Sequence, residues 1–154
     1  MTEILSIGPA QPADAAAIGL LSRNLIEHGL PWTWVPARLR RCIRHNDYVV
    51  LAARRERQIA GFAVMQYHAR HAHLCLLGVR PEFRRRGVGR RLVGWLEKSA
   101  RVAGVFNVIL EVRESNSVAL SFYQRLGYQQ AERLTSYYGP NAHALRLRGD
   151  LRRG

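Results

Sequence analysis

The chain is 154 residues long, a length typical of one domain, and 47% of its residues are hydrophobic, which is enough to bury a core without disulfides or metal ions. We therefore expect a single domain over residues 1–154 and no metal site. The first residues lack the basic and apolar segments of a signal peptide, and no apolar stretch is long enough to cross a membrane. These features argue against a secreted or membrane-spanning protein, and we expect a cytoplasmic one.

The formal net charge of +13 is large for a chain of this size. It could indicate an acidic partner such as ribosomal or other RNA. Only Lys98 among the 24 basic residues is a lysine, so an arginine-leaning codon usage explains the excess as well. Cys42 and Cys75 lie among apolar residues, and we expect buried thiols there rather than a disulfide or a catalytic thiol.

Hydrophobic periodicity predicts alternating strands and helices in the first half of the chain. The expected elements are a strand at residues 4–7, a helix opened by Pro12 and Asp14 and stopped by Gly29, a loop at 30–36, a short helix through Leu39 and Ile43, and a hairpin with strands at 48–53 and 59–65. The polar turn at 55–57 between two apolar runs is the hairpin signal.

The second half of the chain continues the alternation. The expected elements are a strand at 71–79, a helix from Gly87 to Gly104, a strand at 106–112, a helix capped by Ser115 or Ser117 and ending at Leu126-Gly127, and strands at 129–135 and 144–151. Val88, Leu92, Trp95, Leu96 and Val102 are expected to face inward on the long helix. The order predicts a mixed α/β sheet with helices on both faces.

A site for a pyrophosphate is predicted where the strand at 73–79 leads into the segment Arg84–Leu92. Backbone N–H groups at a helix start lack intrahelical partners, and the helix dipole adds partial positive charge. Gly87 and Gly89 lack a Cβ and allow a diphosphate to approach, while arginine guanidinium groups suit phosphate oxygens. Neither the Lys-Ser/Thr of a Walker A loop nor a three-glycine GxGxxG fingerprint is present.

The spacing Arg84-x-x-Gly87-x-Gly89 after Val79-Arg80-Pro81 resembles the coenzyme A signature of the GNAT superfamily of N-acetyltransferases. Residues 107–128 resemble the strand, loop and helix that follow in that family. This second motif runs from Leu110-Glu111-Val112 through Asn116 to Tyr123-x-x-x-Gly127-Tyr128. The resemblance is strong over residues 71–139, and it implies a largely antiparallel central sheet with a splayed strand pair, flanked by helices on both faces.

Within the superfamily, Leu110–Arg113 and Tyr137-Tyr138 are most similar to the bacterial ribosomal-protein-alanine N-acetyltransferases. The resemblance implies acetyl-CoA as cosubstrate, and it places the thioester against backbone groups of the strand end. The cofactor contacts that it implies are Leu77, Gly78, Val79, Arg84, Arg85, Arg86, Gly87, Val88, Gly89, Arg90 and Asn116. Gly78 is compatible with a bulge that frees backbone donors for an oxyanion, and helix capping is the alternative role for Asn116.

Glu111 is the candidate general base, because it interrupts an apolar strand and burial would raise its pKa toward neutrality. The alternative is a carboxylate that faces an arginine across the sheet. His71 and His73 are rival bases, with His73 able to act directly or through a water. Tyr123 matches the family's general acid for the leaving thiolate, and a core tyrosine with a satisfied hydroxyl is the alternative.

The acceptor side is expected in the loops at 28–36 and 136–141, whose aromatic residues suit binding. The substrate-binding candidates are Trp32, Trp34, His73, Tyr137 and Tyr138. One of the two tryptophans could instead cover the core. Asn141–Ala144 replaces an acidic stretch of the ribosomal-protein enzymes, which leaves the acceptor open.

We expect an acetyl-CoA-dependent N-acetyltransferase that acts on the α-amine of a peptide N-terminus by direct attack in a ternary complex. The alternatives are a small-molecule amine acetyltransferase, a non-catalytic acetyl-CoA-binding protein and a basic RNA-associated or ribosome-associated module. The sequence leaves a monomer and a homodimer equally open.

Overall fold

The computed structural model describes residues 5–153. Its helices and strands are β1 (Ser6–Pro9), α1 (Ala15–Leu25), α2 (Pro36–Arg44), β2 (Tyr48–Arg55), β3 (Gln58–Tyr67), β4 (Ala72–Val79), α3 (Val88–Val102), β5 (Asn107–Arg113), α4 (Ser117–Arg125), β6 (Gln129–Gly139) and β7 (Ala142–Asp150). Short 3₁₀ turns lie at Pro12–Asp14, Pro81–Phe83 and Leu151–Arg153. The predicted strand at 4–7 begins later, at β1, and Ile4 lies outside the described residues. None of the helices in residues 5–153 has the length and apolar character needed to cross a membrane.

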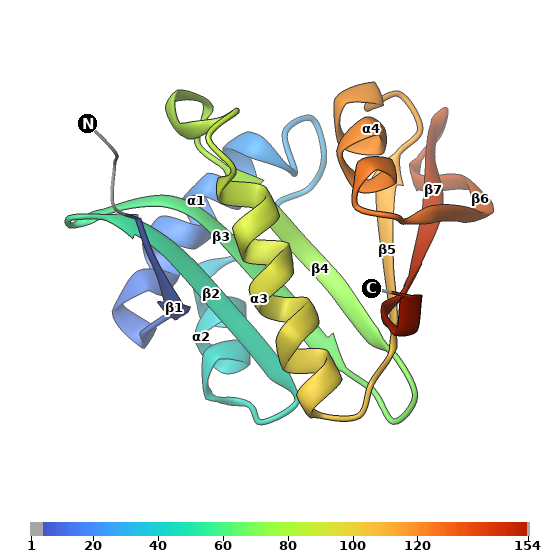
Figure 1. The fold of residues 1–154 in the computed structure, drawn as a ribbon. Coiled ribbons are helices and arrows are strands. Elements are labelled where there is room, and N and C mark those ends of the chain that lie inside the picture. Colours follow the sequence, from blue (N-terminus) through green and yellow to red (C-terminus); the bar gives the residue numbers. More distant parts are fainter. Residues whose placement is uncertain (1–4, 154) are drawn as a thin grey trace.

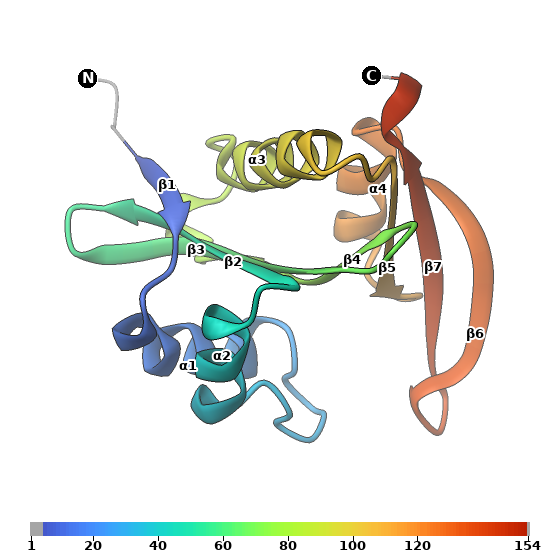
Figure 2. The same ribbon diagram turned by 90° about the horizontal axis from the view of Figure 1, so that it is seen from below.

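The strands form one seven-stranded sheet in the order β1-β2-β3-β4-β5-β7-β6. Every neighbouring pair is antiparallel except β4 and β5, which run parallel. Helices α1 and α2 cover one face of the sheet, while α3 and α4 lie on the other (Figure 1, Figure 2). The predicted mixed α/β sheet with helices on both faces is confirmed.

Each face of the sheet carries its own hydrophobic core. Leu92 and Leu96 of α3 belong to one core, and Ile18 of α1 and Leu39 of α2 belong to the other. The prediction that Val102 faces inward is wrong, because its side chain is 83% exposed. The helix ends there with Gly104 in the left-handed conformation, and the Val105 N–H donates to the Ala100 carbonyl, so that Val105 closes the core instead.

Strands β4 and β5 separate soon after they meet. Their backbones pair only at Ala72 with Val108 and at His73 with Ile109. A β-bulge in β4 follows directly, because Leu74 lies opposite Met65 and Leu76 opposite Val64, which leaves Cys75 as the extra residue. A bulge bends its strand and increases the local twist. This bend turns the rest of β4 away from β5 and produces the expected splayed pair.

Gly78 does not provide the bulge that the sequence suggested, since it pairs regularly with Phe62. Its role is steric. A Cβ at Gly78 would lie 2.5 Å from the Phe62 ring, which is itself fully buried. The glycine therefore makes room for an aromatic side chain in the core beneath the sheet.

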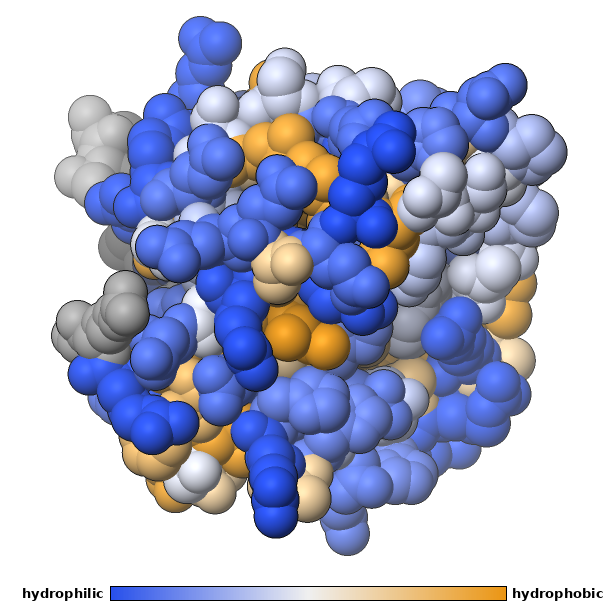
Figure 3. All heavy atoms as spheres, turned by 90° about the vertical axis from the view of Figure 1, so that its right-hand side faces the viewer, coloured by the Kyte–Doolittle hydropathy of each residue, from blue (hydrophilic) through white to orange (hydrophobic). Residues whose placement is uncertain are grey.

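β6 forms the outer edge of the sheet and is exposed along most of its length. Its pairing with β7 is interrupted between Gln130 and Glu132 and again between Leu134 and Gly139. Viewed from this side, the surface is mainly hydrophilic with separate hydrophobic patches (Figure 3). Tyr137 and Tyr138, expected in a loop, lie instead within the irregular second half of β6.

The substitution Gly78→Ala should destabilise the protein by about 1–3 kcal/mol, because the added methyl group overpacks the core against Phe62. Gly94→Ala is the matched control. Nothing lies within 4 Å of a Cβ at Gly94 on the exposed side of α3, so alanine should stabilise the helix by up to ~1 kcal/mol. Urea unfolding of both variants measures the difference, and equal effects would contradict the steric role of Gly78.

Candidate active site

The opening between β4 and β5 is lined by backbone polar groups of β4. The Arg80 N–H donates to the Ala60 carbonyl of β3 at 2.8 Å. Because the residues of an antiparallel strand alternate between the two neighbouring edges, the backbone groups of Leu77 and Val79 point toward the opening. The Val79 carbonyl there accepts a hydrogen bond from Arg84 Nε at 3.2 Å.

The turn before α3 has the backbone geometry of an anion site. Gly87 is the N-cap of α3 with a φ of 78°, and Arg85 has a φ of 63°. Left-handed residues in such a turn direct successive N–H groups to one side, where they form a concave anion-binding nest. Nothing lies within 4 Å of a Cβ at Gly87, which leaves this side of the turn open to a ligand.

Not all of the predicted cofactor residues present their side chains to this turn. Arg84, Arg85, Arg86 and Arg90 are exposed around it, whereas the Val88 side chain is buried in the core. A Cβ at Gly89 would lie 3.2 Å from the Phe122 ring, so the absence of a side chain at Gly89 allows α4 to pack on α3.

Asn116 caps helix α4, since its side-chain oxygen accepts a hydrogen bond from the Ala119 N–H at 3.1 Å. The prediction that Ser115 or Ser117 caps this helix is wrong. The capping role that was the alternative for Asn116 is therefore present, and its amide N–H groups are not used by this hydrogen bond.

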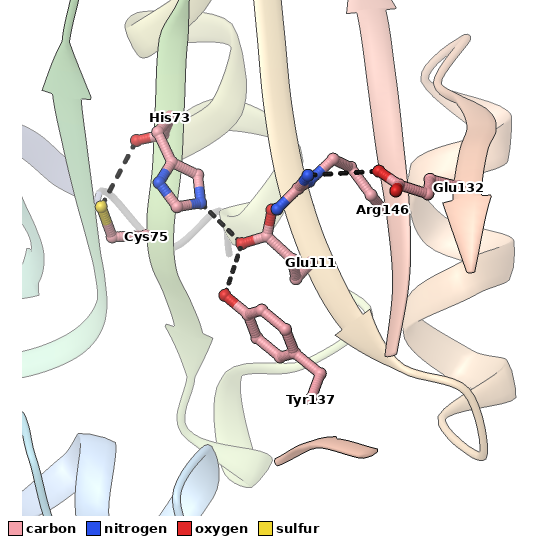
Figure 4. A network of polar contacts seen from close by, with 6 residues as sticks. All are labelled: His73, Cys75, Glu111, Glu132, Tyr137 and Arg146. Atoms are coloured by element: carbon pink, nitrogen blue, oxygen red, sulfur yellow. Dashed lines mark hydrogen bonds and ion pairs between the residues drawn. The ribbon is translucent and has the colours of Figure 1, made fainter. Parts of the chain in front are cut away.

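Glu111 is the centre of a polar network that joins four strands (Figure 4). Its Oε1 lies 2.6 Å from His73 Nε2 of β4 and 3.5 Å from the Tyr137 hydroxyl of β6. Its Oε2 accepts a hydrogen bond from Arg146 Nε of β7 at 2.9 Å, and Arg146 also contacts Glu132 at 3.3 Å. The Glu111 side chain is only 6% exposed, so these partners replace most of its hydration.

The pKa of Glu111 is lowered, which contradicts the expected shift toward neutrality. Burial raises this pKa, but hydrogen bonds and charge interactions with His73 and Arg146 outweigh it. The neighbouring Cys75 side chain and the charge-assisted bond with Glu111 raise the pKa of His73 to about 10. At neutral pH the pair is therefore a carboxylate and an imidazolium, and His73 cannot serve as a base without first losing its proton. The pKa of the other rival, His71, is lowered by burial and by the neighbouring His68.

The Tyr123 side chain of α4 packs in the hydrophobic core on the α3 side of the sheet, together with Val108 and Leu110 of β5. Its ring packs edge-on against Phe122 and Tyr128, and 7% of the residue is exposed. Burial, with a smaller contribution from Tyr138, raises the pKa of Tyr123, so the phenol is protonated at neutral pH. No buried side-chain oxygen or nitrogen in residues 5–153 lacks a hydrogen-bond partner.

The prediction that Trp34 binds the substrate is wrong, because its side chain belongs to the core beneath α1 and α2 and is 8% exposed. The Arg38 guanidinium lies over its ring at 3.6 Å. Trp32 is partly buried, and its indole N–H donates to the Gly19 carbonyl of α1 at 3.1 Å while Arg23 lies over the ring. Both rings thus fix the loop to the helices.

Glu27 organises the loop between α1 and α2, a role that no sequence pattern indicates. Its buried carboxylate accepts hydrogen bonds from the Ser22 hydroxyl, from the backbone and hydroxyl of Thr33 and from the Trp34 N–H. Arg113 at the end of β5 then ties the loop to the sheet, because its Nη2 donates to the carbonyls of Ile26 at 2.8 Å and His28 at 2.9 Å.

The two tyrosines of β6 lie against this end of β5. The rings of Tyr137 and Tyr138 are 4.9 Å apart and perpendicular, and the Arg113 guanidinium lies 5.8 Å from the Tyr138 ring. Tyr138 is partly buried, and burial together with Tyr137 and Glu111 raises its pKa to about 12. The structure thus brings His73, Glu111, Tyr137 and Tyr138 together, and it leaves Trp34 apart from them.

Comparison with known proteins identifies the class of protein that has this fold and this opening. Residues 20–128 match the acetyltransferase (GNAT) family, and the chain belongs to that family. The family resemblance drawn from the coenzyme A signature is thereby confirmed.

Individual relatives are consistent with this assignment. The chain is 36% identical over 91 residues to ribosomal protein bS18-alanine N-acetyltransferase of Salmonella typhimurium, and the match covers 59% of this chain and 62% of that protein. The crystal structure of ribosomal-protein-S18-alanine N-acetyltransferase from Escherichia coli has a TM-score of 0.83 and 25% identity, over 96% of this chain and 94% of that one. The Arabidopsis thaliana NAA60 structure with acetyl-CoA has a TM-score of 0.84 at 17% identity, over 97% and 99% of the two chains, and shows the shared fold.

The contribution of His73 to stability should depend on pH. Because its folded pKa of about 10 lies above its ordinary value of 6.5, the stabilisation is fully present below pH 6.5 and is lost as the pH rises through 10. The melting temperature of His73→Gln should therefore lie furthest below that of the wild type at pH 6, and the gap should narrow toward pH 10.

Thermal unfolding at pH 6, 8 and 10 measures this gap. His45→Gln is the control, since the His45 side chain is 58% exposed and lies 3.9 Å from its acidic neighbour Asp47. A gap for His73→Gln that stays constant over this pH range would contradict a charged His73–Glu111 pair.

Proposed function

We propose that the protein is an acetyl-CoA-dependent N-acetyltransferase that moves an acetyl group to a primary amine, the α-amine of a peptide or protein N-terminus, by direct attack in a ternary complex. The observation that carries the proposal is the position of two groups on opposite faces of the sheet. Glu111 lies on the side of α1 and α2, and Tyr123 lies on the side of α3 and α4. A base and an acid separated in this way suit an acyl donor held between them.

The residues around the opening fit acetyl-CoA. The nest at Arg85–Gly87 and the exposed arginines beside it would hold the pyrophosphate, and the backbone groups of Leu77 and Val79 would hold the pantetheine arm. When bound, acetyl-CoA supplies an activated acyl group with a thiolate as leaving group. A backbone N–H directed at the developing oxyanion is typically worth about 3 kcal/mol of transition-state stabilisation.

Glu111 is the group that we assign as proton acceptor for the incoming amine. The lowered pKa makes Glu111 a weak base, so it suits an amine that loses its proton readily. An α-amine, with a pKa of about 8, loses its proton more easily than a lysine, with a pKa of about 10.4. His73 and Arg146 hold the carboxylate in one orientation. The ammonium proton of the acceptor then moves to the Glu111 carboxylate, either directly or through a water.

Tyr123 is the group that we assign to the leaving sulfur. Its raised pKa keeps the phenol protonated, and the O–H can donate a hydrogen bond to a thiolate as charge develops on sulfur. A phenol is ordinarily a weaker acid than a thiol, since their pKa values are about 10 and 8.5. We therefore assign Tyr123 to stabilise the developing thiolate by donating a hydrogen bond to the sulfur.

The acceptor assignment is supported by the relatives and by the aromatic pair Tyr137 and Tyr138 beside Glu111. The relatives are named for acetylation of an alanine of a ribosomal protein, which is an α-amine target. We propose the same acceptor class for this chain, with the bacterial cytoplasm as its location and without assigning the ribosomal protein itself.

Tyr123→Phe should lower kcat by about 10²–10³ with little change in the affinity for acetyl-CoA, because it removes a donor that acts only as sulfur leaves. Glu111→Gln should lower kcat and also change the pH profile, because it removes the proton acceptor. Steady-state kinetics with calorimetric binding of acetyl-CoA separates the two effects. Equal losses of cofactor binding in both variants would show that these residues are structural.

The overall assignment is tested with a panel of amines. We expect acetyl-CoA to bind in calorimetry, and coenzyme A to be released with peptides that have a free α-amine but not with spermidine or an aminoglycoside. Absence of binding at millimolar acetyl-CoA would overturn the enzyme assignment. Turnover confined to the polyamine or the aminoglycoside would overturn the acceptor assignment, and binding without turnover of any amine would indicate a non-catalytic acetyl-CoA-binding protein.

A further inference from the structure

A cavity of about 270 Å³ lies where the end of β5 meets the turn between β6 and β7. It is lined by Arg113, Glu114, Ser115, Tyr138, Asn141, Ala142 and His143. The Glu114 N–H donates to the His143 carbonyl at 2.9 Å, which fixes the turn against the end of β5. The cavity contains polar donors but only one carboxylate.

The carboxylate of Glu114 is already neutralised. Arg133 of β6 contacts it through two nitrogens, with Nε on Oε2 and Nη2 on Oε1. This forked arrangement is the strong form of an arginine–carboxylate pair. Glu114 therefore contributes little net negative charge to the cavity.

The positive charge of Arg113 is not neutralised in the same way. Its Nη2 donates to two backbone carbonyls in the loop between α1 and α2, and no salt bridge within residues 5–153 involves it. A guanidinium has five N–H donors, and the two on Nη2 are used by these carbonyls. The charge and three further donors remain for a ligand.

His143 adds a donor to the same cavity. Its Nδ1 accepts a hydrogen bond from the Ser136 N–H at 2.8 Å, so the proton of the neutral ring lies on Nε2. The Ser115 hydroxyl and the Asn141 amide group complete a donor-rich lining. A group with two acceptor oxygens and a negative charge, that is a carboxylate, matches this lining best.

The cavity lies within reach of an acceptor peptide bound at Glu111. Glu111 and Arg113 are two residues apart on β5, so their side chains leave the same face of the strand about 7 Å apart. An extended peptide spans a similar distance in two residues. An acceptor whose α-amine meets Glu111 can therefore bring the side chain of its second or third residue to Arg113.

We propose that this cavity binds an acidic side chain at the second or third residue of the acceptor, so that the preferred substrates are peptides with acidic N-terminal segments. The inference rests on the proposed function, because it assumes that the α-amine is acetylated at Glu111. Arg113 is the specificity-determining residue, and the Arg133–Glu114 pair keeps the one acidic group of the cavity from attracting basic side chains.

The test compares kcat/KM for three peptides of one length that begin with alanine and carry Glu, Gln or Lys at both the second and third positions. The wild type should prefer the Glu peptide to the Gln peptide by ~10-fold, the size of effect expected for a charge-assisted hydrogen bond in a partly buried site, and the Lys peptide should be the poorest. Peptides with a single Glu at either position then identify which residue the cavity binds.

Two variants separate specificity from structure. Arg113→Gln should abolish the preference for Glu over Gln, whereas a merely structural effect on the loop would lower turnover of all three peptides by the same factor. Arg133→Gln should free Glu114 and move the preference toward Lys. Arg44→Gln on the exposed side of α2 is the control, and its order of preference should be that of the wild type.

The outcomes distinguish this inference from the function on which it rests. No turnover of any peptide would overturn the proposed function. Equal turnover of the three peptides, a preference for Lys in the wild type or an unchanged order in Arg113→Gln would overturn the acidic acceptor while leaving N-terminal acetylation intact.

Discussion

The ion pair between Glu111 and His73 is the constraint on which the site depends. The backbones of β4 and β5 stop pairing at His73 and Ile109. Glu111, two residues after Ile109 on β5, then contacts His73 through its side chain. Arg146 holds the same carboxylate from β7. The opening in the sheet thus begins next to a side-chain bond of 2.6 Å, which fixes where the proposed proton acceptor lies.

The two sides of this opening differ in physical character. On the side of α1 and α2, charged and polar groups surround Glu111 and keep it ionised. On the other side, the rings of Phe122 and Tyr128 pack around Tyr123 and keep it protonated. Opposite environments therefore place an ionised acceptor and a protonated donor on opposite faces of one sheet. This separation is possible in a small chain because successive side chains of a strand point to opposite faces of the sheet, and because helices cover both faces.

The fold and the cofactor end of the site could be predicted because their signals are local. A strand, a glycine-containing turn and a helix start are contiguous in the sequence, and the periodicity of α3 identifies most of its buried positions. The protonation state of Glu111 could not be predicted, since it depends on the cross-strand register that brings Arg146 opposite. The open alternative of a carboxylate facing an arginine is the arrangement observed.

The acceptor end was harder to predict because loops carry no periodicity. Two tryptophans in a loop indicate binding and packing equally well, and only tertiary contacts with α1 and α2 decide for packing in the case of Trp34. The role of Glu27 likewise could not be predicted, because its hydrogen-bond partners come together only in the folded loop. The bulge at Cys75 was missed because a glycine three residues later was the more obvious candidate in the sequence.

The contacts of Arg113 have a thermodynamic consequence for the loop between α1 and α2. One guanidinium holds the carbonyls of Ile26 and His28 and also faces the cavity beside Tyr138. Any ligand that restrains this guanidinium also restrains the loop, and by reciprocity an ordered loop raises the affinity for the ligand. Acceptor binding and ordering of the loop are thus thermodynamically coupled. Hydrogen exchange of the loop amides would therefore report whether the cavity is occupied, although no residue of this loop lines the cavity.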